Sequence, residues 1–277
     1  MKKQIIYKNV NWVKYQGMLI PDIPPHQLVE FKRDECKSLL KNSRAHLVRW
    51  ISEWDKTEKS EFWYIIKDEY KGLEEFSSNT RSKIRRGLKR NEAFRIDKQE
   101  LKNSGFNVYL SAFKRYKTFI KPMSQKEFCD RIDKMDSDEY DFWAVYNKEQ
   151  LVAYAEVRKM KEMCHLNIIK FHPDYMKQYP GYALFYSLID HYLSLEHIGY
   201  ISNGTKSLSH DTNIQEFLLQ KFNFRKAYCR LNICYSPIVK LVVVLLYPFR
   251  KALNKIPFNI AQKLYALLNQ EYIKQNS

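Results

Sequence analysis

Glycine and proline are scarce in this sequence, with 7 and 9 copies among 277 residues. Flexible linkers and low-complexity segments are rich in both, so we expect a folded chain without them. The five cysteines are odd in number and form neither a CxxC motif nor a Cys/His pair. The sequence therefore predicts free thiols in a reducing compartment, with no disulfide framework and no metal site.

Long apolar runs are also missing. No segment reaches the ~18 apolar residues that a helix spanning a bilayer needs. The first residues, MKKQIIYKNV, lack the apolar stretch and cleavage site of a secretory signal. We therefore expect a cytoplasmic protein.

Acidic residues are outnumbered: the chain has 31 Asp and Glu against 47 Lys and Arg, for a net charge of +16. This excess predicts an anionic partner, either a phosphate-bearing cofactor, a nucleic acid or an anionic membrane surface. It is concentrated between Arg81 and Arg90, where six basic residues and no acid occur. We expect a short helix there, capped near Ser77, with only Ile84 and Leu88 facing inward. The basic surface either binds an anion or is simply solvated.

The periodicity of the apolar residues predicts one core built from helices and strands. Residues 1–60 show no clear pattern, apart from 44–54, which fits a helix or a wide strand. Three consecutive strands between 140 and 171 predict an antiparallel meander. The expected strands are 62–68, 94–96, 140–146, 150–157, 163–171, 199–202 and 224–235, and the expected helices are 104–120, 124–135, 180–195 and about 212–221.

Small polar residues gather between the strand at 199–202 and the helix after it. Strand ends beside helix N-termini often carry ligand contacts in α/β proteins. An ordinary connecting loop is the alternative. The residues are Asn203, Gly204, Ser209, His210, Thr212 and Asn213.

The sequence changes character after Ser236. Residues 238–249 are almost all apolar but too few to cross the roughly 30 Å of a bilayer's hydrocarbon. Residues 258–273 place apolar side chains on one helical face. Three interpretations stay open: a hairpin packed on the chain's own core, contact with an anionic membrane at its inner face, and an oligomer contact.

The order of elements from 95 to 235 resembles that of the GNAT acyltransferase fold. One motif is an Asn on a helix followed by Lys-x-Gly-Phe, which Asn213, Lys221 and Phe224 match, with Asn223 in place of the glycine. The resemblance implies an α/β (α+β) fold with a mixed, mostly antiparallel twisted sheet flanked by helices.

A second motif lies between Lys177 and Ala183, KQYPGYA, where the family has Arg/Gln-x-x-Gly-x-Gly/Ala. The resemblance implies that backbone amides at a helix N-terminus bind the pyrophosphate of acyl-CoA, either acetyl-CoA or a longer ester, without a metal. The cofactor-binding residues would be Lys177, Gln178, Tyr179, Gly181, Tyr182, Ala183 and Asn213.

The stretch 77–86, SSNTRSKIRR, is similar to the Fem-type subgroup, which modifies building blocks of the cell envelope. Full Fem-type enzymes carry two GNAT-like domains, whereas this chain has room for one complete copy and a partial one before it. We expect an N-terminal extension at 1–76, the acyltransferase domain at 77–236 and C-terminal helices at 237–277.

Direct acyl transfer to an amine needs a base and oxyanion donors but no covalent nucleophile. The candidate bases are Glu156, His165 and His210. The structural alternatives are an ion pair of Glu156 with Arg158 or a neighbouring strand's lysine on the solvent face of the sheet, and a capping or loop position for His210. Strand alternation predicts that Cys164, Leu166 and Ile168 face one way and His165, Asn167 and Ile169 the other. The candidate substrate-binding residues are Arg81, Arg85, Asn167, Asn203, Gly204, Ser209 and Thr212.

We therefore expect an N-acyltransferase that moves an acyl group from acyl-CoA to the amine of an amino sugar or another envelope or polysaccharide precursor. The acceptor would be a small molecule or linked to a lipid. Two alternatives stay open. One is Fem-type transfer to peptidoglycan precursors from aminoacyl-tRNA, a less simple donor than acyl-CoA. The other is a non-catalytic scaffold at a membrane surface.

Overall fold

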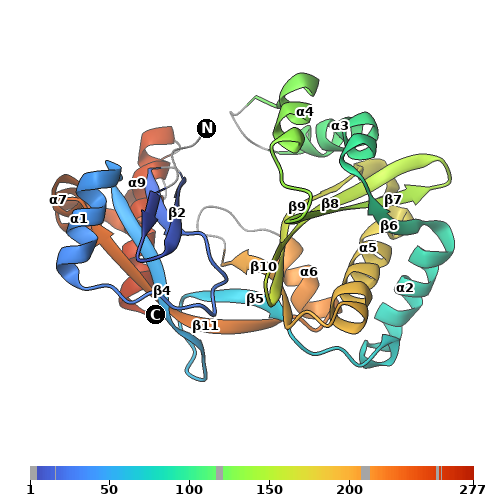
Figure 1. Cartoon of the computed structure of the whole chain (residues 1–277), viewed down its shortest axis with the longest axis horizontal. Helices are drawn as coiled ribbons and strands as arrows, with labels where there is room; N and C mark the ends of the chain where they lie inside the picture. The colour runs from blue at the N-terminus through green and yellow to red at the C-terminus, as the bar shows by residue number, and fades with distance from the viewer. Residues whose placement is uncertain (1–4, 16, 117–120, 207–212, 254–255, 257) are drawn as a thin grey trace. The chain divides into compact units, whose positions relative to one another are not determined.

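The computed structural model describes residues 5–15, 17–116, 121–206, 213–253, 256 and 258–277 (Figure 1). The chain divides into two compact units. The terminal unit comprises Met1–Tyr64, Thr205–Thr212 and Lys226–Ser277, and the central unit comprises Ile65–Gly204 and Asn213–Arg225. The terminal unit thus joins residues of the expected N-terminal extension with residues of the expected C-terminal segment.

The terminal unit is a sheet with helices from both chain ends. Strand β3 is antiparallel to β2 and parallel to β4, and β4 is antiparallel to β11, so residues 44–54, which fitted a helix or a strand, lie mostly in a strand. Its elements are β1 (Ile5–Tyr7), β2 (Val10–Tyr15), β3 (Met18–Pro21), α1 (Arg33–Ser43), β4 (Leu47–Lys56), β11 (Arg225–Tyr235), α7 (Pro237–Leu246), α8 (Arg250–Leu253) and α9 (Asn259–Gln275).

The C-terminal helix α9 packs on the core of the terminal unit. Its Leu268 and Ile273 are buried, and Ile273 belongs to a cluster with Phe62 and Leu231. This supports the packing interpretation for α9. None of the helices in the described ranges is long and apolar enough to cross a membrane.

The central unit holds the meander that the sequence predicts. Strands β6 to β9 pair antiparallel in chain order, and β10 adds to β9 in parallel. The mixed, mostly antiparallel sheet is thus confirmed. Its elements are β5 (Trp63–Lys67, shared with the terminal unit), α2 (Ser78–Arg90), β6 (Glu92–Ile96), α3 (Lys98–Phe113), α4 (Gln125–Asp133), β7 (Tyr140–Asn147), β8 (Gln150–Met160), β9 (Met163–Phe171), α5 (Pro180–Ile189), β10 (Tyr200–Thr205) and α6 (Asn213–Lys221).

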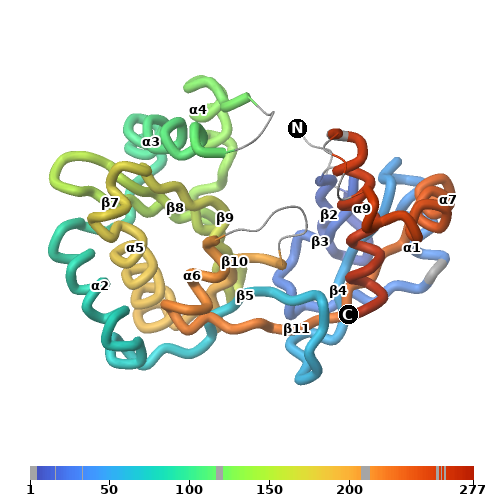
Figure 2. Tube along the Cα trace, turned by 180° about the vertical axis from the view of Figure 1, so that it is seen from behind, coloured from blue at the N-terminus to red at the C-terminus, as the bar shows by residue number. Residues whose placement is uncertain are grey.

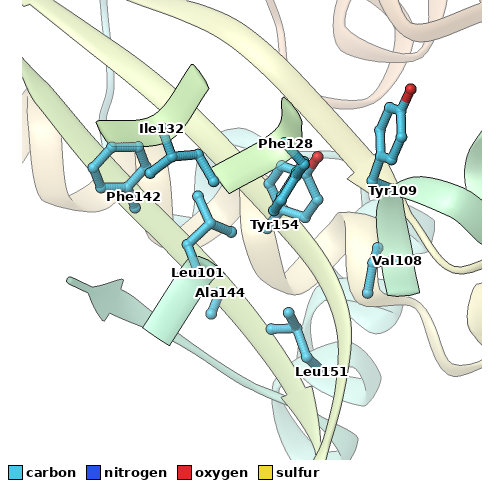
Figure 3. Packing of buried hydrophobic residues seen from close by; sticks show 9 residues of the cluster. All are labelled: Leu101, Val108, Tyr109, Phe128, Ile132, Phe142, Ala144, Leu151 and Tyr154. Atoms are coloured by element: carbon cyan, nitrogen blue, oxygen red, sulfur yellow. The ribbon is translucent and has the colours of Figure 1, made fainter. Parts of the chain in front are cut away.

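Helices cover both faces of the central sheet (Figures 1 and 2). On one face, α3 and α4 bury a cluster against β7 and β8 that includes Leu101, Phe128 and Tyr154 (Figure 3). Helix α4 begins at the capping box formed by Ser124 and Glu127, as its sequence pattern predicts. Helices α5 and α2 pack on the other face.

The basic helix α2 forms where the charge run predicts it. Ser77 caps it by accepting a hydrogen bond from the amide of Thr80. The expected inward position of Leu88 is wrong, because its side chain is 39% exposed. The buried residues of the helix are Thr80, Ile84 and Gly87, since helix α5 packs against that side.

Candidate functional site

Strands β9 and β10 separate partway along their length. Only three residue pairs join them, and the last is Ser202 with His165. Strand β9 continues to Phe171 and β10 to Thr205, so both strands extend beyond their pairing (Figure 1). The backbone groups of Asn203 and Gly204 therefore border a gap in the β9–β10 ladder.

A β-bulge in β9 lies beside this separation. Leu166 pairs with Val157 of β8, but the next pair is Ile168 with Glu156, so Asn167 is an extra, exposed residue in β9. The bulge shifts the alternation by one, so that Ile168 shares a face with His165 rather than with Leu166. The predicted assignment of Ile168 and Ile169 is therefore wrong, and the inserted residue is the reason.

His165 lies at the point of separation. Burial, together with the nearby charge of Arg158, lowers the pKa of its imidazole from 6.5 to about 4, although a hydrogen bond to the backbone of Ser202 acts in the opposite direction. The ring is neutral at pH 7 as a result. Gly204 has a φ of 80°, and a Cβ there would be 3.3 Å from the Cε1 of His165. The structure thus brings together His165 and Gly204, with Asn167 two residues along β9.

Glu156 is fully buried and forms a bidentate ion pair. Its two oxygens accept hydrogen bonds of 2.7 and 2.6 Å from the guanidinium of Arg131 on α4. The carboxylate also lies on the sheet face that α3 and α4 cover. An ion pair for Glu156 therefore fits the geometry better than a role as a base. The expected partner, Arg158 or a lysine of a neighbouring strand, and the expected solvent-facing position are wrong, because the carboxylate is buried against Arg131 of α4.

The predicted pyrophosphate motif forms a loop and the start of a helix. Residues Pro173–Gln178 form a 3₁₀ helix, Tyr179 adopts a left-handed conformation with a φ of 59°, and α5 begins at Pro180. The carbonyl of Lys177 accepts a hydrogen bond from Arg90, and that of Gln178 accepts one from Asn91. The end of helix α2 thus holds this loop in place.

The contact between α2 and this loop depends on a glycine. A Cβ at Gly87 would lie 2.9 Å from the carbonyl oxygen of Tyr179 and 3.2 Å from the amide nitrogen of Ala183. Both are backbone atoms, so the two segments can approach only because position 87 has no side chain. Gly87 and Asn91 were not among the predicted site residues; an isolated glycine within a helical pattern is the signal that could have indicated Gly87.

Three cations of α2 lie over tyrosine rings of the motif. The guanidinium groups of Arg86 and Arg90 are 5.8 and 5.7 Å from the ring centre of Tyr179, and the ammonium of Lys83 is 5.6 Å from that of Tyr182. Positive charge is therefore concentrated beside the N-terminus of α5. This charge and the left-handed loop suit the pyrophosphate of a nucleotide cofactor.

The predicted substrate residues Arg81 and Arg85 have other partners. Both form ion pairs with Glu74 at 3.4 Å, and Arg81 also donates a 2.7 Å hydrogen bond to the carbonyl of Phe76. The helix thus has one group of cations at Glu74 and another at Tyr179.

Several predicted cofactor residues are buried. Gly181, Tyr182 and Ala183 lie in the core, where the ring of Tyr182 contacts those of Phe217 and Phe222. A Cβ at Gly181 would meet Phe171 at an ordinary 3.5 Å. The amides of Tyr182 and Ala183 already donate to the carbonyl of Tyr179, so neither is available to a cofactor, whereas the side chain of Lys177 is exposed.

Asn213 is the first residue of α6 and is exposed. The predicted residues Ser209, His210 and Thr212 lie outside the described part of the chain. At the end of α6, Asn223 replaces the glycine of the motif and has a φ of 52°, a left-handed conformation that asparagine tolerates. No group of metal-binding side chains occurs among the residues that the structure describes.

Comparison with known proteins agrees with this architecture. Residues 78–207 match a family model described as an acetyltransferase (GNAT) domain. No curated protein matched the chain in a sequence search.

Solved structures with a similar fold are distant in sequence. FemX aligns with a TM-score of 0.51 and 10% identity, over 79% of this chain and 81% of that one. A conserved protein of unknown function from Bacteroides thetaiotaomicron aligns with a TM-score of 0.52 and 10% identity, over 82% and 86%. L-PGS from Bacillus licheniformis aligns with a TM-score of 0.49 and 11% identity, over 94% and 85%. Residues 78–207 are therefore similar to an acetyltransferase (GNAT) domain, and the fold of the chain is similar to that of FemX.

Proposed function

We propose that the central unit transfers an acyl group from acyl-CoA to an amine. The observation that carries this proposal is the arrangement of Arg86 and Arg90 on Tyr179, beside the N-terminus of α5. The pyrophosphate of the cofactor would bind there, and the thioester would reach the separation of β9 and β10. When bound, acyl-CoA supplies an activated acyl group with a thiolate leaving group.

The proposed reaction is direct attack of the amine on the thioester carbonyl. A bond forms between the amine nitrogen and the carbonyl carbon, the carbon–sulfur bond breaks and the thiolate leaves, and the proton released by the nitrogen protonates the thiolate directly or through solvent. Cys164 is an unsuitable nucleophile, because its thiol is fully buried in β9 and burial raises its pKa well above the usual value. Amides and side chains at the strand separation would instead orient the reactants.

In this mechanism His165 would orient the amine rather than act as a strong base. With a pKa of about 4, a neutral imidazole accepts a hydrogen bond at pH 7 but holds a transferred proton weakly. Asn167, Asn203 and Gly204 would contact the acceptor. His210 stays a candidate base on sequence grounds.

The acceptor would be the amine of an amino sugar or of another envelope or polysaccharide precursor, and the protein would act in the cytoplasm. The resemblance of residues 77–86 to the Fem-type subgroup supports this acceptor class and also a second candidate, transfer from aminoacyl-tRNA. The net charge of +16 suits either anionic donor.

The test is a thermal-shift series with the whole protein. Acetyl-CoA, longer acyl-CoA esters and aminoacyl-tRNA are added separately, because a ligand that binds only the folded state raises the midpoint. We expect stabilisation by a CoA ester, followed by CoA release when amino-sugar acceptors are added. Stabilisation by aminoacyl-tRNA alone would reject acyl-CoA as the donor. If no donor stabilises the protein, a non-catalytic scaffold becomes the better explanation.

A further inference from the structure

A large cavity lies inside the terminal unit and shares no residue with the site described above. Its volume is about 910 Å³, and residues of α1, β4, β11, α7 and α9 line it. Both α1 and α7, labelled in Figure 1, contribute residues to its lining. A volume of this size is near the upper end of the range for small-molecule sites, about 300–1,000 Å³.

The inner wall of the cavity is apolar. Cys36, Leu40 and Ile233 are almost fully buried there, and Phe31 and Trp50 add aromatic surface. The rings of Phe31 and Trp50 pack together with centres 5.3 Å apart. Such a wall favours a hydrocarbon chain over a nucleotide or sugar, whose polar groups would lose their hydration without gaining partners.

The outer part of the cavity is cationic. Four lysines and no acidic residue line it: Lys37, Lys41, Lys240 and Lys274. Within the described residues, Lys41 and Lys240 are exposed and have no ion-pair partner.

The other two lysines each have one acidic neighbour. Lys37 contacts the exposed Asp34 at 3.2 Å, and Lys274 contacts Glu271 at 3.1 Å. Positive charge therefore exceeds negative charge where the cavity meets solvent. This excess favours an anionic head group.

Helix α7 adds an apolar surface beside the cavity. Pro237 and Lys240 of α7 line the cavity, while Ile238, Leu241 and Val244 of the same helix are 78%, 60% and 62% exposed. An exposed apolar helix face with a nearby cation is typical of helices that lie in a membrane interface. One lipid molecule of that membrane would then supply both the acyl chain in the cavity and the anionic head group at the lysines.

We propose that the terminal unit docks on a bilayer through α7 and binds an anionic lipid, with one acyl chain in the cavity and the head group at Lys41 and Lys240. The proposal does not depend on acyl transfer. Its readout is lipid binding, so its failure and that of the proposed function are distinguishable.

The experiment measures binding of the full chain to vesicles. The vesicles contain phosphatidylcholine alone or an equimolar mixture with phosphatidylglycerol that carries a doxyl quencher on an acyl chain. We expect binding to the mixed vesicles with quenching of Trp50, and little binding to neutral vesicles. Trp50→Phe should lose most of the quenching per bound vesicle, whereas Trp143→Phe in the central unit should keep it.

The double variant K41Q/K240Q should bind the mixed vesicles roughly twentyfold more weakly, since each lysine at a membrane surface contributes roughly fivefold. The matched control K148Q/K161Q removes the same charge from exposed turns of the central unit and should change binding much less. A second variant, Leu241→Ser/Val244→Ser, changes only exposed positions and should also weaken binding.

Three results would overturn the proposal. Equal weakening by both lysine pairs would mean that net charge alone attracts the protein. Binding without quenching of Trp50 would mean that no acyl chain enters the cavity. Quenching by a doxyl fatty acid in solution, without vesicle binding, would replace the bilayer lipid with a free amphiphile.

Discussion

The guanidinium of Arg131 and the carboxylate of Glu156 form two parallel hydrogen bonds of 2.7 and 2.6 Å. They join helix α4 to the centre of strand β8. Because Glu156 is fully buried, its charge depends on this one partner. The pair therefore stabilises the packing of α4 on the sheet, and its loss would leave an isolated charge in the core.

The first prediction is that Arg131→Met destabilises the protein by about 3 to 5 kcal/mol, the cost of leaving a buried charge unpaired. Arg131→Met/Glu156→Leu should recover most of this loss, because it removes both charges. Urea unfolding measures both variants. As a control, Asp130→Asn breaks an exposed ion pair with Lys126 on the same helix and should barely change the unfolding midpoint. Equal stability of Arg131→Met and the wild type would contradict the structural role of the pair.

The second prediction compares two glycines. Gly87→Ala should cost about 1 to 3 kcal/mol, because its Cβ would overlap the backbone at Tyr179, and it should also weaken binding of the CoA ester by displacing the loop. Gly181→Ala should change stability by less than about 1 kcal/mol, since its Cβ meets Phe171 at normal distance. Thermal unfolding with and without the ester measures both effects. A larger loss of stability in Gly181→Ala than in Gly87→Ala would contradict the close backbone contact at Gly87.

The third prediction concerns the cations of α2. Arg86→Gln/Arg90→Gln should weaken acyl-CoA binding about tenfold, because two charges beside the phosphates are lost. Wild-type binding should weaken as salt is raised, and the variant should respond less. Arg85→Gln is the matched control, because Arg85 pairs with Glu74. If Arg85→Gln weakens binding as much as the double variant, the phosphates bind elsewhere on the helix. Calorimetric titration measures each constant.

The fourth prediction follows from the lowered pKa of His165. As pH falls from 6.5 to about 4, the unfolded chain binds a proton at this position and the folded protein does not, so stability falls. The full loss from this group, about 3 kcal/mol, is present below pH 4 and absent above pH 6.5. His165→Asn should remove this part of the acid sensitivity. Urea midpoints at pH 7 and pH 4.5 test it, and parallel pH profiles of the two proteins would argue against the burial of His165.

Much of the central unit could be predicted from the sequence because its signals are local. The meander follows from alternating residues and short turns, and the starts of α2 and α4 follow from the caps at Ser77 and Ser124. The terminal unit was not predicted as one unit, because its two parts pair across a large sequence separation, as β4 does with β11. No local pattern records such pairing. The local pairs β1–β2 and β2–β3 were missed as well, although those strands are close in sequence.

The candidate site could also be predicted only in part. The loop at Lys177–Ala183 could be located from its motif, but which side chains are buried could not. The partner of Glu156 is 25 residues away on a helix, and the cations that approach Tyr179 belong to a helix almost 90 residues earlier in the chain. Such contacts depend on how helices pack on the sheet, which periodicity alone does not determine.

The extra residue in β9 also affects how this chain tolerates insertions and deletions. Deletion of Asn167 would remove the bulge and leave Ile168 opposite Glu156, so the residues from Ile168 to Phe171 would keep their present faces. Phe171 would still pack on Phe185 of α5, but β9 would lose the local bend that a bulge produces. Relatives without this residue should therefore keep the same core contacts of β9 and differ in the strand's course beside the separation from β10.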